Sequence, residues 1–249
     1  MLKRIAILGQ DQPDLSISGA EDVQIIRAES ADLPQSTDAL VASGDGATAV
    51  EAAITLAQRH EAVLELLAEA IDCREQFRPG SSQRVVEHAA RFSKALGLSQ
   101  DDQVTLERGA LLRDIGKLRI ANDVLLKDSL LTYDEWTLIY SHPGIGAELV
   151  AQTDGLTDIE GIVASHHECF DGTGYPNGTE GEMIPLLGRI VKVIDVYCAM
   201  TSPRIYRDTV ASKDEALTHL SEERGKHFDP ELVDVFVLND IGDDSVSPG

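Results

Sequence analysis

The sequence predicts a mainly α-helical protein, in which a small α/β unit and a long linking helix precede a helical bundle. Three observations support this fold class. Short β-like runs occur in the first 46 residues, an Ala-, Leu- and Glu-rich stretch follows, and from residue 81 onward apolar residues recur at helical spacing. Of the 249 residues, 43% are hydrophobic and 4% are aromatic, so we expect a substantial core built from aliphatic side chains.

The predicted N-terminal unit covers residues 1–46. Its β-like runs are "KRIAILG", "VQIIRA" and "DALVAS", and clusters of Asp, Pro, Ser and Gly separate them. Such runs indicate a small α/β unit that could receive an input signal. A shrunken relative of a receiver domain is one interpretation, although no acidic triad can be assigned.

A linker helix is predicted within residues 47–80. The stretch "AVEAAITLAQRHEAVLELLAEAIDCREQF" has strong helix propensity as far as Phe77, and "RPGSS" then ends the helix. An Ala- and Leu-rich helix ahead of an output domain can pair with a second copy of itself. We therefore expect a homodimer through residues 47–77, although the apolar spacing is not a clean heptad.

The helical bundle is predicted over residues 81–240, followed by a disordered tail at 241–249. Serines at 81 and 82 are expected to cap its first helix, "SSQRVVEHAARFSKALGLS". Thr132 and Glu135 have the spacing of a capping box. In "LLGRIVKVIDVYCAMTS", four apolar residues fall on one helical face, namely Ile190, Val193, Ile194 and Tyr197.

Charge and composition exclude several classes of function. The net charge of −22 argues against nonspecific nucleic-acid binding, which needs a basic surface. No apolar run reaches the roughly 18 residues of a membrane span. Three widely spaced cysteines are typical of reduced thiols in a cytosol. We expect a soluble cytoplasmic protein with neither a nucleic-acid nor a membrane partner.

Five residues could ligate a metal, and all fall in or at the ends of predicted helices: Asp114, His142, His166, His167 and Asp195. The two aspartates have apolar neighbours, and a buried carboxylate is costly unless it is paired or binds a metal. Imidazole with carboxylate suits Zn, Fe, Mn or Ni. Each histidine alone is more often structural than a ligand, but adjacent histidines beside Glu168 and a Gly-rich loop are uncommon.

Two further segments could bind a ligand. The loop "DGTGYPNG" is either a simple helix connector or a rigid rim that presents Tyr175 beside the histidine pair. The segment "TSPRIYR" is either a solvated basic turn or a phosphate-binding element, in which Arg204 and Arg207 would act. Cations cluster in the segments that carry the candidate residues of this very acidic chain, which favours an anionic ligand: Arg113, Lys117, Arg119, Lys192, Arg204 and Arg207.

In order along the chain, the motifs resemble those of the HD-GYP domain, a branch of the HD phosphohydrolases. The matching pieces run from about Ser81 to Phe236: "RDIGK", "SHPGIG", "HHECFDGTGYPNG", "IPLLGRIVKVIDVYCAMTSPRIYR" and "GKHFDPELVDVF". The resemblance implies an all-helical fold with a bi- or trinuclear centre, often of iron or manganese. The implied activity is metal-dependent hydrolysis of cyclic di-GMP, in which the metals activate the attacking water and stabilise developing charge.

The resemblance also implies roles for individual residues. Asp114 would bridge two metals and Lys117 would contact the phosphate or the attacking water. Tyr175 would line the pocket. Two arginines, Arg204 and Arg207, would hold the phosphates of the ligand. One metal would be completed by His142, His166 and His167, and Asp195 would serve the other.

The chain departs from the family pattern at that second metal. Arg113 stands where the family has a histidine, and Ser81 stands where it has another. Both of those histidines belong with Asp195 to one metal position, which therefore loses two ligands. Seven residues after Ser81, His88 lies about 10 Å further along the helix axis and cannot replace the missing ligand.

Two other positions also differ. Cys198 occupies a usual aspartate position, where a small buried hydrophobic residue is the simpler interpretation. Phe77 falls where the family has a glutamate that supports a third metal, which argues against a trinuclear site.

The fixed charge of Arg113 predicts that its guanidinium occupies or neutralises the vacated metal position, paired with Asp114 or Asp195. We expect one divalent ion, iron or manganese, or none, rather than two. Three functions are left open: a degenerate protein that binds cyclic di-GMP or a related phosphodiester with weak or no hydrolysis, an active phosphodiesterase, or a scaffold that contacts a regulatory protein such as a diguanylate cyclase. The resemblance does not cover residues 1–80.

Overall fold

The computed structural model describes the secondary structure of residues 4–7, 24–27, 39–42, 46–75, 80–202 and 210–243. Phe77, Arg204, Arg207 and residues 244–249 of the predicted tail lie outside these ranges. The chain divides into two compact units, residues 1–64 and 65–249. The domain boundaries predicted from the sequence stay a prediction, but the predicted disorder is wrong at the start of the tail, because Ile241 is 3% exposed and packs in the hydrophobic core.

The first unit contains a small parallel sheet. Its strands are β1 (Arg4–Ile7), β2 (Gln24–Arg27) and β3 (Ala39–Ala42), in the order β2-β1-β3. Ile5 of β1 pairs with Ile25 of β2 on one side and with Leu40 of β3 on the other. These strands confirm the prediction that the three β-like runs form strands. Helix α1 (Gly46–Arg74) begins in this unit and ends in the second, three residues short of the predicted end.

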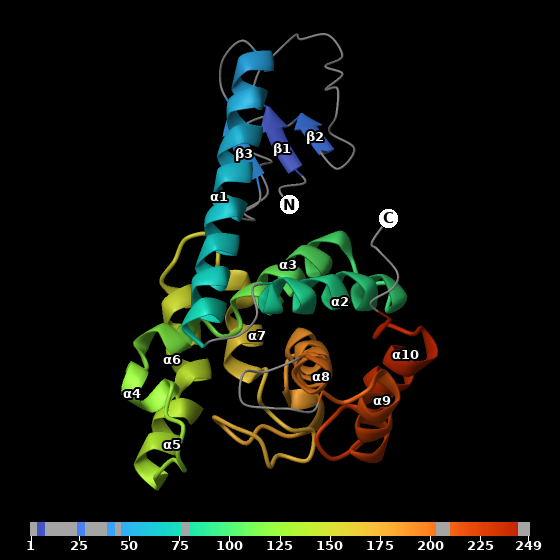
Figure 1. Ribbon diagram of the computed structural model, residues 1–249. Coiled ribbons are helices and arrows are strands. Elements are labelled where there is room, and N and C mark those ends of the chain that lie inside the picture. Colours follow the sequence, from blue (N-terminus) through green and yellow to red (C-terminus); the bar gives the residue numbers. More distant parts are fainter. Residues whose placement is uncertain are drawn as a thin grey trace. The chain divides into compact units, whose positions relative to one another are not determined.

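The second unit is helical, as predicted (Figure 1). None of the helices in the described ranges is long and apolar enough to cross a membrane. After the end of α1, its elements are α2 (Ser81–Ala95), α3 (Gln100–Leu112), η1 (Ile115–Arg119), α4 (Asn122–Leu125), α5 (Tyr133–Tyr140), α6 (His142–Ala151), η2 (Thr157–Ile159), α7 (Glu160–Ser165), η3 (Gly181–Met183), α8 (Leu186–Thr201), α9 (Lys213–Glu222) and α10 (Pro230–Leu238).

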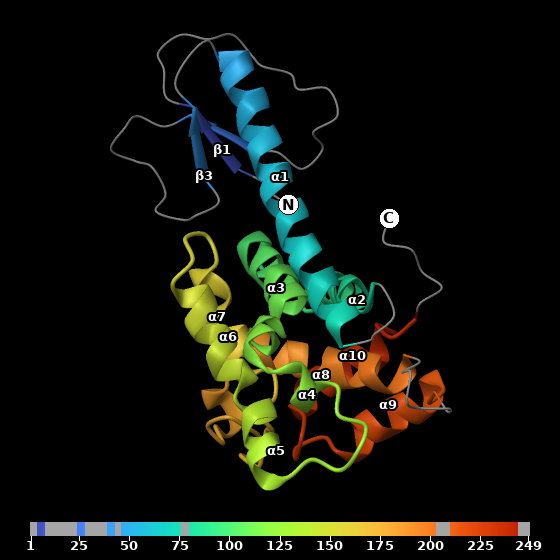
Figure 2. The same ribbon diagram turned by 60° about the vertical axis from the view of Figure 1, so that its left-hand side comes forward.

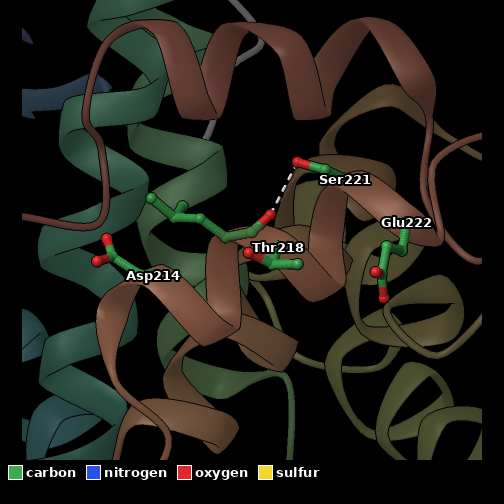
Figure 3. Close-up of a pocket in the computed structure, with 5 residues that line it drawn as sticks. Asp214, Thr218, Ser221 and Glu222 are labelled. Carbon is green, nitrogen blue, oxygen red and sulfur yellow. Dashed lines mark hydrogen bonds between the residues drawn. The ribbon is translucent and has the colours of Figure 1, made fainter.

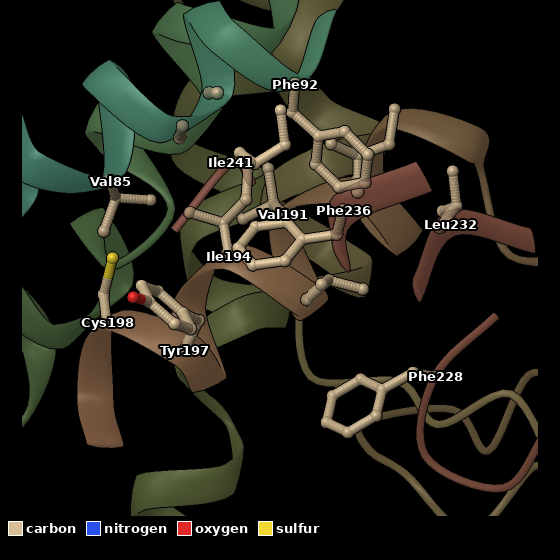
Figure 4. Close-up of a cluster of buried hydrophobic side chains, with 14 of the residues drawn as sticks. Val85, Phe92, Val191, Ile194, Tyr197, Cys198, Phe228, Leu232, Phe236 and Ile241 are labelled. Atoms are coloured by element: carbon tan, nitrogen blue, oxygen red, sulfur yellow. The ribbon is translucent and has the colours of Figure 1, made fainter. Parts of the chain in front are cut away.

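Helix α8 is the centre of this unit and packs against α2, α3, α7, α9 and α10 (Figure 1 and Figure 2). The predicted face of α8 is confirmed, because all four of its apolar residues are buried. Aromatic rings contribute more to the core than we expected. Phe236 lies 5.3 Å from Phe92 and 5.2 Å from Tyr197, measured between ring centroids (Figure 4). Such ring pairs add to the stability gained from burial.

Helix ends follow the predictions in one case and depart from them in another. Thr132 and Glu135 form the predicted capping box at α5. The serines at the start of α2 do not cap it, because Gly80 is its N-cap in a left-handed conformation. Instead, the carboxylate of Asp72 on α1 accepts hydrogen bonds of 2.8 Å from both the backbone N–H and the hydroxyl of Ser82. A distant side chain thus satisfies this helix end.

Close backbone contact fixes η1 against α6. A Cβ atom added to Gly116 would lie 1.9 Å from the carbonyl oxygen of His142 and 2.6 Å from the backbone nitrogen of Gly146. Backbone atoms cannot rotate away as a side chain can, so the approach requires glycine. This contact holds the segment after Asp114 beside the first residue of α6.

We predict that Gly116→Ala destabilises the protein by roughly 3 kcal/mol, as overpacking does. Urea unfolding measures the change. Gly144→Ala is the matched control, because a Cβ at Gly144 meets nothing within 4 Å. This control should be neutral or stabilising by up to about 1 kcal/mol through helix propensity. Equal stability of the two variants would contradict the close packing of η1 on α6.

Candidate metal centre

Four of the five predicted metal ligands meet in the structure. Asp114 lies between α3 and η1, His142 begins α6, and His166 and His167 follow α7. One potential ligand atom from each lies within 4.8 Å of the others. Three of the residues are buried and His167 is half-buried. We call these residues the four-ligand group.

Backbone hydrogen bonds fix the tautomers of two of the histidines. The carbonyl oxygen of Ile139 lies 2.7 Å from Nδ1 of His142, and that of Val163 lies 2.9 Å from Nδ1 of His166. A carbonyl only accepts, so each Nδ1 carries the hydrogen and donates it. The Nε2 atom of each neutral ring then presents a lone pair, which is the arrangement of metal-binding histidines.

These lone pairs converge. The Nε2 atoms of His142 and His166 are 3.3 Å apart, and Oδ1 of Asp114 lies 3.3 Å from the first and 3.8 Å from the second. Burial lowers the pKa of His166 and His167, which favours the neutral form that ligates a metal. Two lone pairs and a carboxylate at this separation repel one another unless a cation lies among them. The donors present therefore fit a divalent metal ion.

Asp195 on α8, the fifth predicted ligand, is engaged differently. Its Oδ1 accepts a hydrogen bond of 2.7 Å from Nε of Arg113. Nη1 of Arg113 donates to the carbonyl of Ala110 at 3.0 Å, and Nη2 lies 3.4 Å from Asp114. Arg113 is 5% exposed and thus links both carboxylates inside the protein. The predicted pairing of Arg113 is confirmed, whereas a ligand role for Asp195 stays a prediction.

The charge of Arg113 and Lys117 keeps these carboxylates ionised. Burial alone would raise the pKa of Asp114, but Lys117 and Arg113 together hold it well below its usual value. Burial would likewise raise the pKa of Asp195, and Arg113 lowers it. Asp114 is therefore a carboxylate ready to bind a metal.

Lys117 also has a partner that sequence reasoning missed. Its Nζ lies 3.0 Å from Oδ1 of Asp114 and 2.9 Å from Oε1 of Glu75, just after α1. Burial is the largest influence on Glu75 and raises its pKa. Arg74 strengthens the same connection, because it donates to the carbonyl of Lys117 at 2.5 Å. No motif or spacing marks Glu75, since nothing local indicates that the chain after α1 meets η1.

Tyr175 lies beside the histidine pair, as the second interpretation of its loop predicted. Its ring stacks on His167 at 4.7 Å with an interplanar angle of 23°. Buried Glu168 holds the loop by accepting hydrogen bonds from the backbone of Asn177 at 2.8 Å and Thr179 at 3.2 Å. Gly174 lets the loop pass close to the backbone just after the histidine pair, because a Cβ there would lie 2.2 Å from a backbone nitrogen of that segment.

The remaining candidates are structural or lie elsewhere. The buried ring of His88 has its Nδ1 2.9 Å from the carbonyl oxygen of Ile241, which agrees with its exclusion as a ligand. Cys198 belongs to the hydrophobic core, as its simpler interpretation predicted (Figure 4). Ser81 is the first residue of α2. The phosphate-binding roles of Arg204 and Arg207 concern residues that the structure does not describe.

A depression of about 500 Å³ on α9 is separate from this group. Those of its lining residues that lie in the described ranges come from one helix, between Asp214 and Glu222 (Figure 3). Ser221 in this wall donates a hydrogen bond of 2.8 Å to the carbonyl of Leu217. Among the residues that the structure describes, the lining contains neither a histidine nor a basic side chain.

We predict that His166→Gln removes bound metal, because it deletes one of the converging lone pairs. Plasma mass spectrometry of the purified variant, loaded alongside the wild type, measures the loss. His227→Gln is the control, since the side chain of His227 is 47% exposed and pairs with Glu223 at 3.7 Å outside the group. Unchanged metal content in His166→Gln would contradict the assignment.

We also predict that Lys117→Met destabilises the metal-free protein by about 3 kcal/mol, because it leaves the largely buried carboxylates of Asp114 and Glu75 without their shared cation. Urea unfolding at neutral pH measures this change. Glu75→Gln in the Lys117→Met background should recover part of the loss, because it removes one of the unpaired charges. If the double variant is as unstable as the sum of its single changes, Glu75 and Lys117 do not interact as described.

Comparisons with known proteins show the family of the chain. The sequence profile of the HD domain matches residues 65–232. The chain is 38% identical over 182 residues to the cyclic di-GMP phosphodiesterase response regulator RpfG of Xanthomonas campestris, covering 72% of this chain and 48% of that protein. It is 31% identical over 171 residues to 3'3'-cGAMP-specific phosphodiesterase 3 of Vibrio cholerae, covering 69% of this chain and 37% of the relative.

A third relative is a cyclic di-GMP phosphodiesterase of Thermotoga maritima, 32% identical over 70% of this chain and 48% of its own length. The fold resembles a crystal structure of the cyclic GMP-AMP phosphodiesterase V-cGAP3 of V. cholerae, with a TM-score of 0.53 and 21% identity over 70% of this chain and 48% of the other. The chain spans about half of these proteins or less. Because the family profile covers most of the chain, this protein belongs to the HD domain family.

Proposed function

We propose that this chain acts in cyclic dinucleotide signalling, binding cyclic di-GMP or a related cyclic dinucleotide and hydrolysing it slowly or not at all. The relatives named above are phosphodiesterases of cyclic di-GMP and of 3'3'-cGAMP, which supports the class of ligand. The four-ligand group supports a metal beside the phosphodiester. Iron or manganese would suit this mixture of imidazole and carboxylate.

One observation supports weak or absent hydrolysis. The guanidinium of Arg113 bonds to Asp195 and lies near Asp114, inside the protein. In the family that the sequence resembles, an aspartate and two histidines would hold a second metal. Here the aspartate is Asp195, but Arg113 and Ser81 stand in place of the two histidines. Arg113 neutralises the carboxylates without coordinating water, and so it cannot acidify water as a metal does. A cation at this position favours binding of a phosphodiester more than its hydrolysis.

The residues present define how a ligand would be held. Asp114, His142, His166 and His167 would bind one divalent ion, which would polarise the phosphodiester and assist attack by water. Lys117, held between Asp114 and Glu75, would contact a phosphate oxygen or orient the attacking water. Its pKa is raised by these carboxylates against the effect of burial, so it stays a cation at neutral pH.

Tyr175 would line the ligand pocket beside the four-ligand group, and Arg204 and Arg207 would bind the phosphates of the ligand. The stacking of Tyr175 on His167 supports the first of these roles. Burial raises the pKa of Tyr175 further above its usual value, so its hydroxyl stays protonated and can donate a hydrogen bond to an anionic ligand. The roles of the two arginines rest on their motif alone.

An active phosphodiesterase with a single metal is the second candidate. The intact four-ligand group favours it, because a protein that only binds partners has no chemical need for these converging donors. A regulatory partner such as a diguanylate cyclase, and a homodimer through residues 47–77, stay predictions from the sequence.

Restoring the missing histidines tests the proposal. We predict that the Ser81→His, Arg113→His double variant hydrolyses cyclic di-GMP at least tenfold faster than the wild type, while its affinity changes less. Liquid chromatography of the products gives the rate, and equilibrium dialysis gives the affinity. Ser81→His alone is the control, since Arg113 still neutralises the two carboxylates in it. A wild-type rate equal to that of the double variant would contradict the inhibitory role of Arg113.

A further inference from the structure

Helix α5 exposes an unusual amount of aromatic surface. None of its eight residues, all described by the structure, is buried. Trp136 is 44% exposed and Tyr140 is 43% exposed, although both rings could gain stability by complete burial. The chain contains a single tryptophan, and it lies in this helix. The exposure of α5 therefore requires an explanation beyond the packing of the fold.

The exposed rings continue into the four-ligand group. Trp136 and Tyr140 lie 5.3 Å apart between centroids, with an interplanar angle of 35°. Tyr140 lies 4.3 Å from Tyr175 at 30°, and Tyr175 lies 4.7 Å from His167 at 23°. All three pairs are stacked or tilted rather than edge-on, at spacings typical of interacting aromatic rings. A continuous row of rings thus leads from the surface of α5 to a proposed metal ligand.

The helix that presents these rings is held firmly at its start. Its first turn has the complete capping box of Thr132 and Glu135. Lys127 pairs with the same Glu135 at 2.7 Å. These polar contacts order the first turn of α5 without burying its aromatic side chains, and the ring contacts hold Trp136 against Tyr140 and Tyr140 against Tyr175. A preordered ring binds a flat ligand with less loss of conformational entropy than a mobile ring does.

We propose that Trp136 and Tyr140 form a stacking surface for one purine base of the cyclic dinucleotide whose phosphodiester lies at the four-ligand group. This inference rests on the proposed function and adds a base-binding site to it. Each base of a cyclic dinucleotide is joined to its phosphate through one sugar, so a base must lie near any bound phosphodiester. Aromatic side chains bind bases of any identity through their π-faces, and this binding does not depend on the net charge of the protein.

Fluorescence of Trp136 gives a direct test, because the chain has no other tryptophan. The metal-loaded full-length protein is titrated with cyclic di-GMP, and quenching is compared with the affinity from equilibrium dialysis. We expect saturable quenching with the same midpoint as binding. Trp136→Ala and Tyr140→Ala should each weaken binding about tenfold, whereas Trp136→Phe, which keeps a flat ring, should retain most of the affinity.

Three controls separate base stacking from other effects. Tyr133→Ala changes an aromatic residue of the same helix that is 85% exposed, and it should bind like the wild type. Metal content should be equal in all variants, because none of these residues belongs to the four-ligand group. Inorganic phosphate, which has no base, should compete equally well in the wild type and in Trp136→Ala.

The outcomes distinguish this inference from the proposed function. If the wild type binds cyclic di-GMP but Trp136→Ala and Tyr140→Ala bind it equally well, the base lies elsewhere and only the inference fails. If cyclic di-GMP binding saturates without any change in Trp136 fluorescence, the inference also fails. The exposed rings would then be better explained as a contact surface for a protein partner. If the wild type binds no cyclic dinucleotide, the proposed function fails and the base site fails with it.

Discussion

The buried guanidinium of Arg113 is the interaction on which the site depends. It bonds to Asp195 at 2.7 Å and lies 3.4 Å from Asp114, which joins α8 to the end of α3. Two ionised carboxylates this deep in a protein would repel each other strongly without a cation. Lys117 likewise forms ion pairs with Asp114 and Glu75 and neutralises their charge. Fixed protein cations therefore supply part of the positive charge that metal ions would otherwise provide.

Fixed cations and metal ions are not equivalent in chemistry. Both attract a phosphodiester, but only a metal ion acidifies water and accepts its oxygen as a ligand. The four-ligand group would offer one place for such an ion, with the Nδ1 hydrogens of His142 and His166 bonded to backbone carbonyls. Next to the four-ligand group, the row of aromatic rings from Tyr175 through Tyr140 to Trp136 offers a flat apolar surface. Under the proposed function, this combination would favour recognition of a nucleotide over its rapid hydrolysis.

Local patterns in the sequence predicted the features that depend on local physics. The α8 face follows from helical spacing, the Thr132 capping box from its residue pattern, and the proximity of the four candidate ligands from motifs. Contacts between distant segments were not predictable in this way. Asp72 caps α2, Glu75 pairs with Lys117, and the ring of Tyr140 lies against that of Tyr175. The fold brings these residues together, and no local pattern records it. The pairing of Arg113 could be predicted, since an unneutralised arginine cannot be buried beside a metal site.

The number of metal ions bound per chain tests this account most directly. The wild-type protein would be loaded with manganese or iron in excess, freed of unbound metal and measured by plasma mass spectrometry against protein concentration. The account predicts one ion per chain, because Arg113 neutralises the carboxylates that would attract a second. Two ions per chain would contradict it, since a second ion could then bind despite the guanidinium between Asp114 and Asp195.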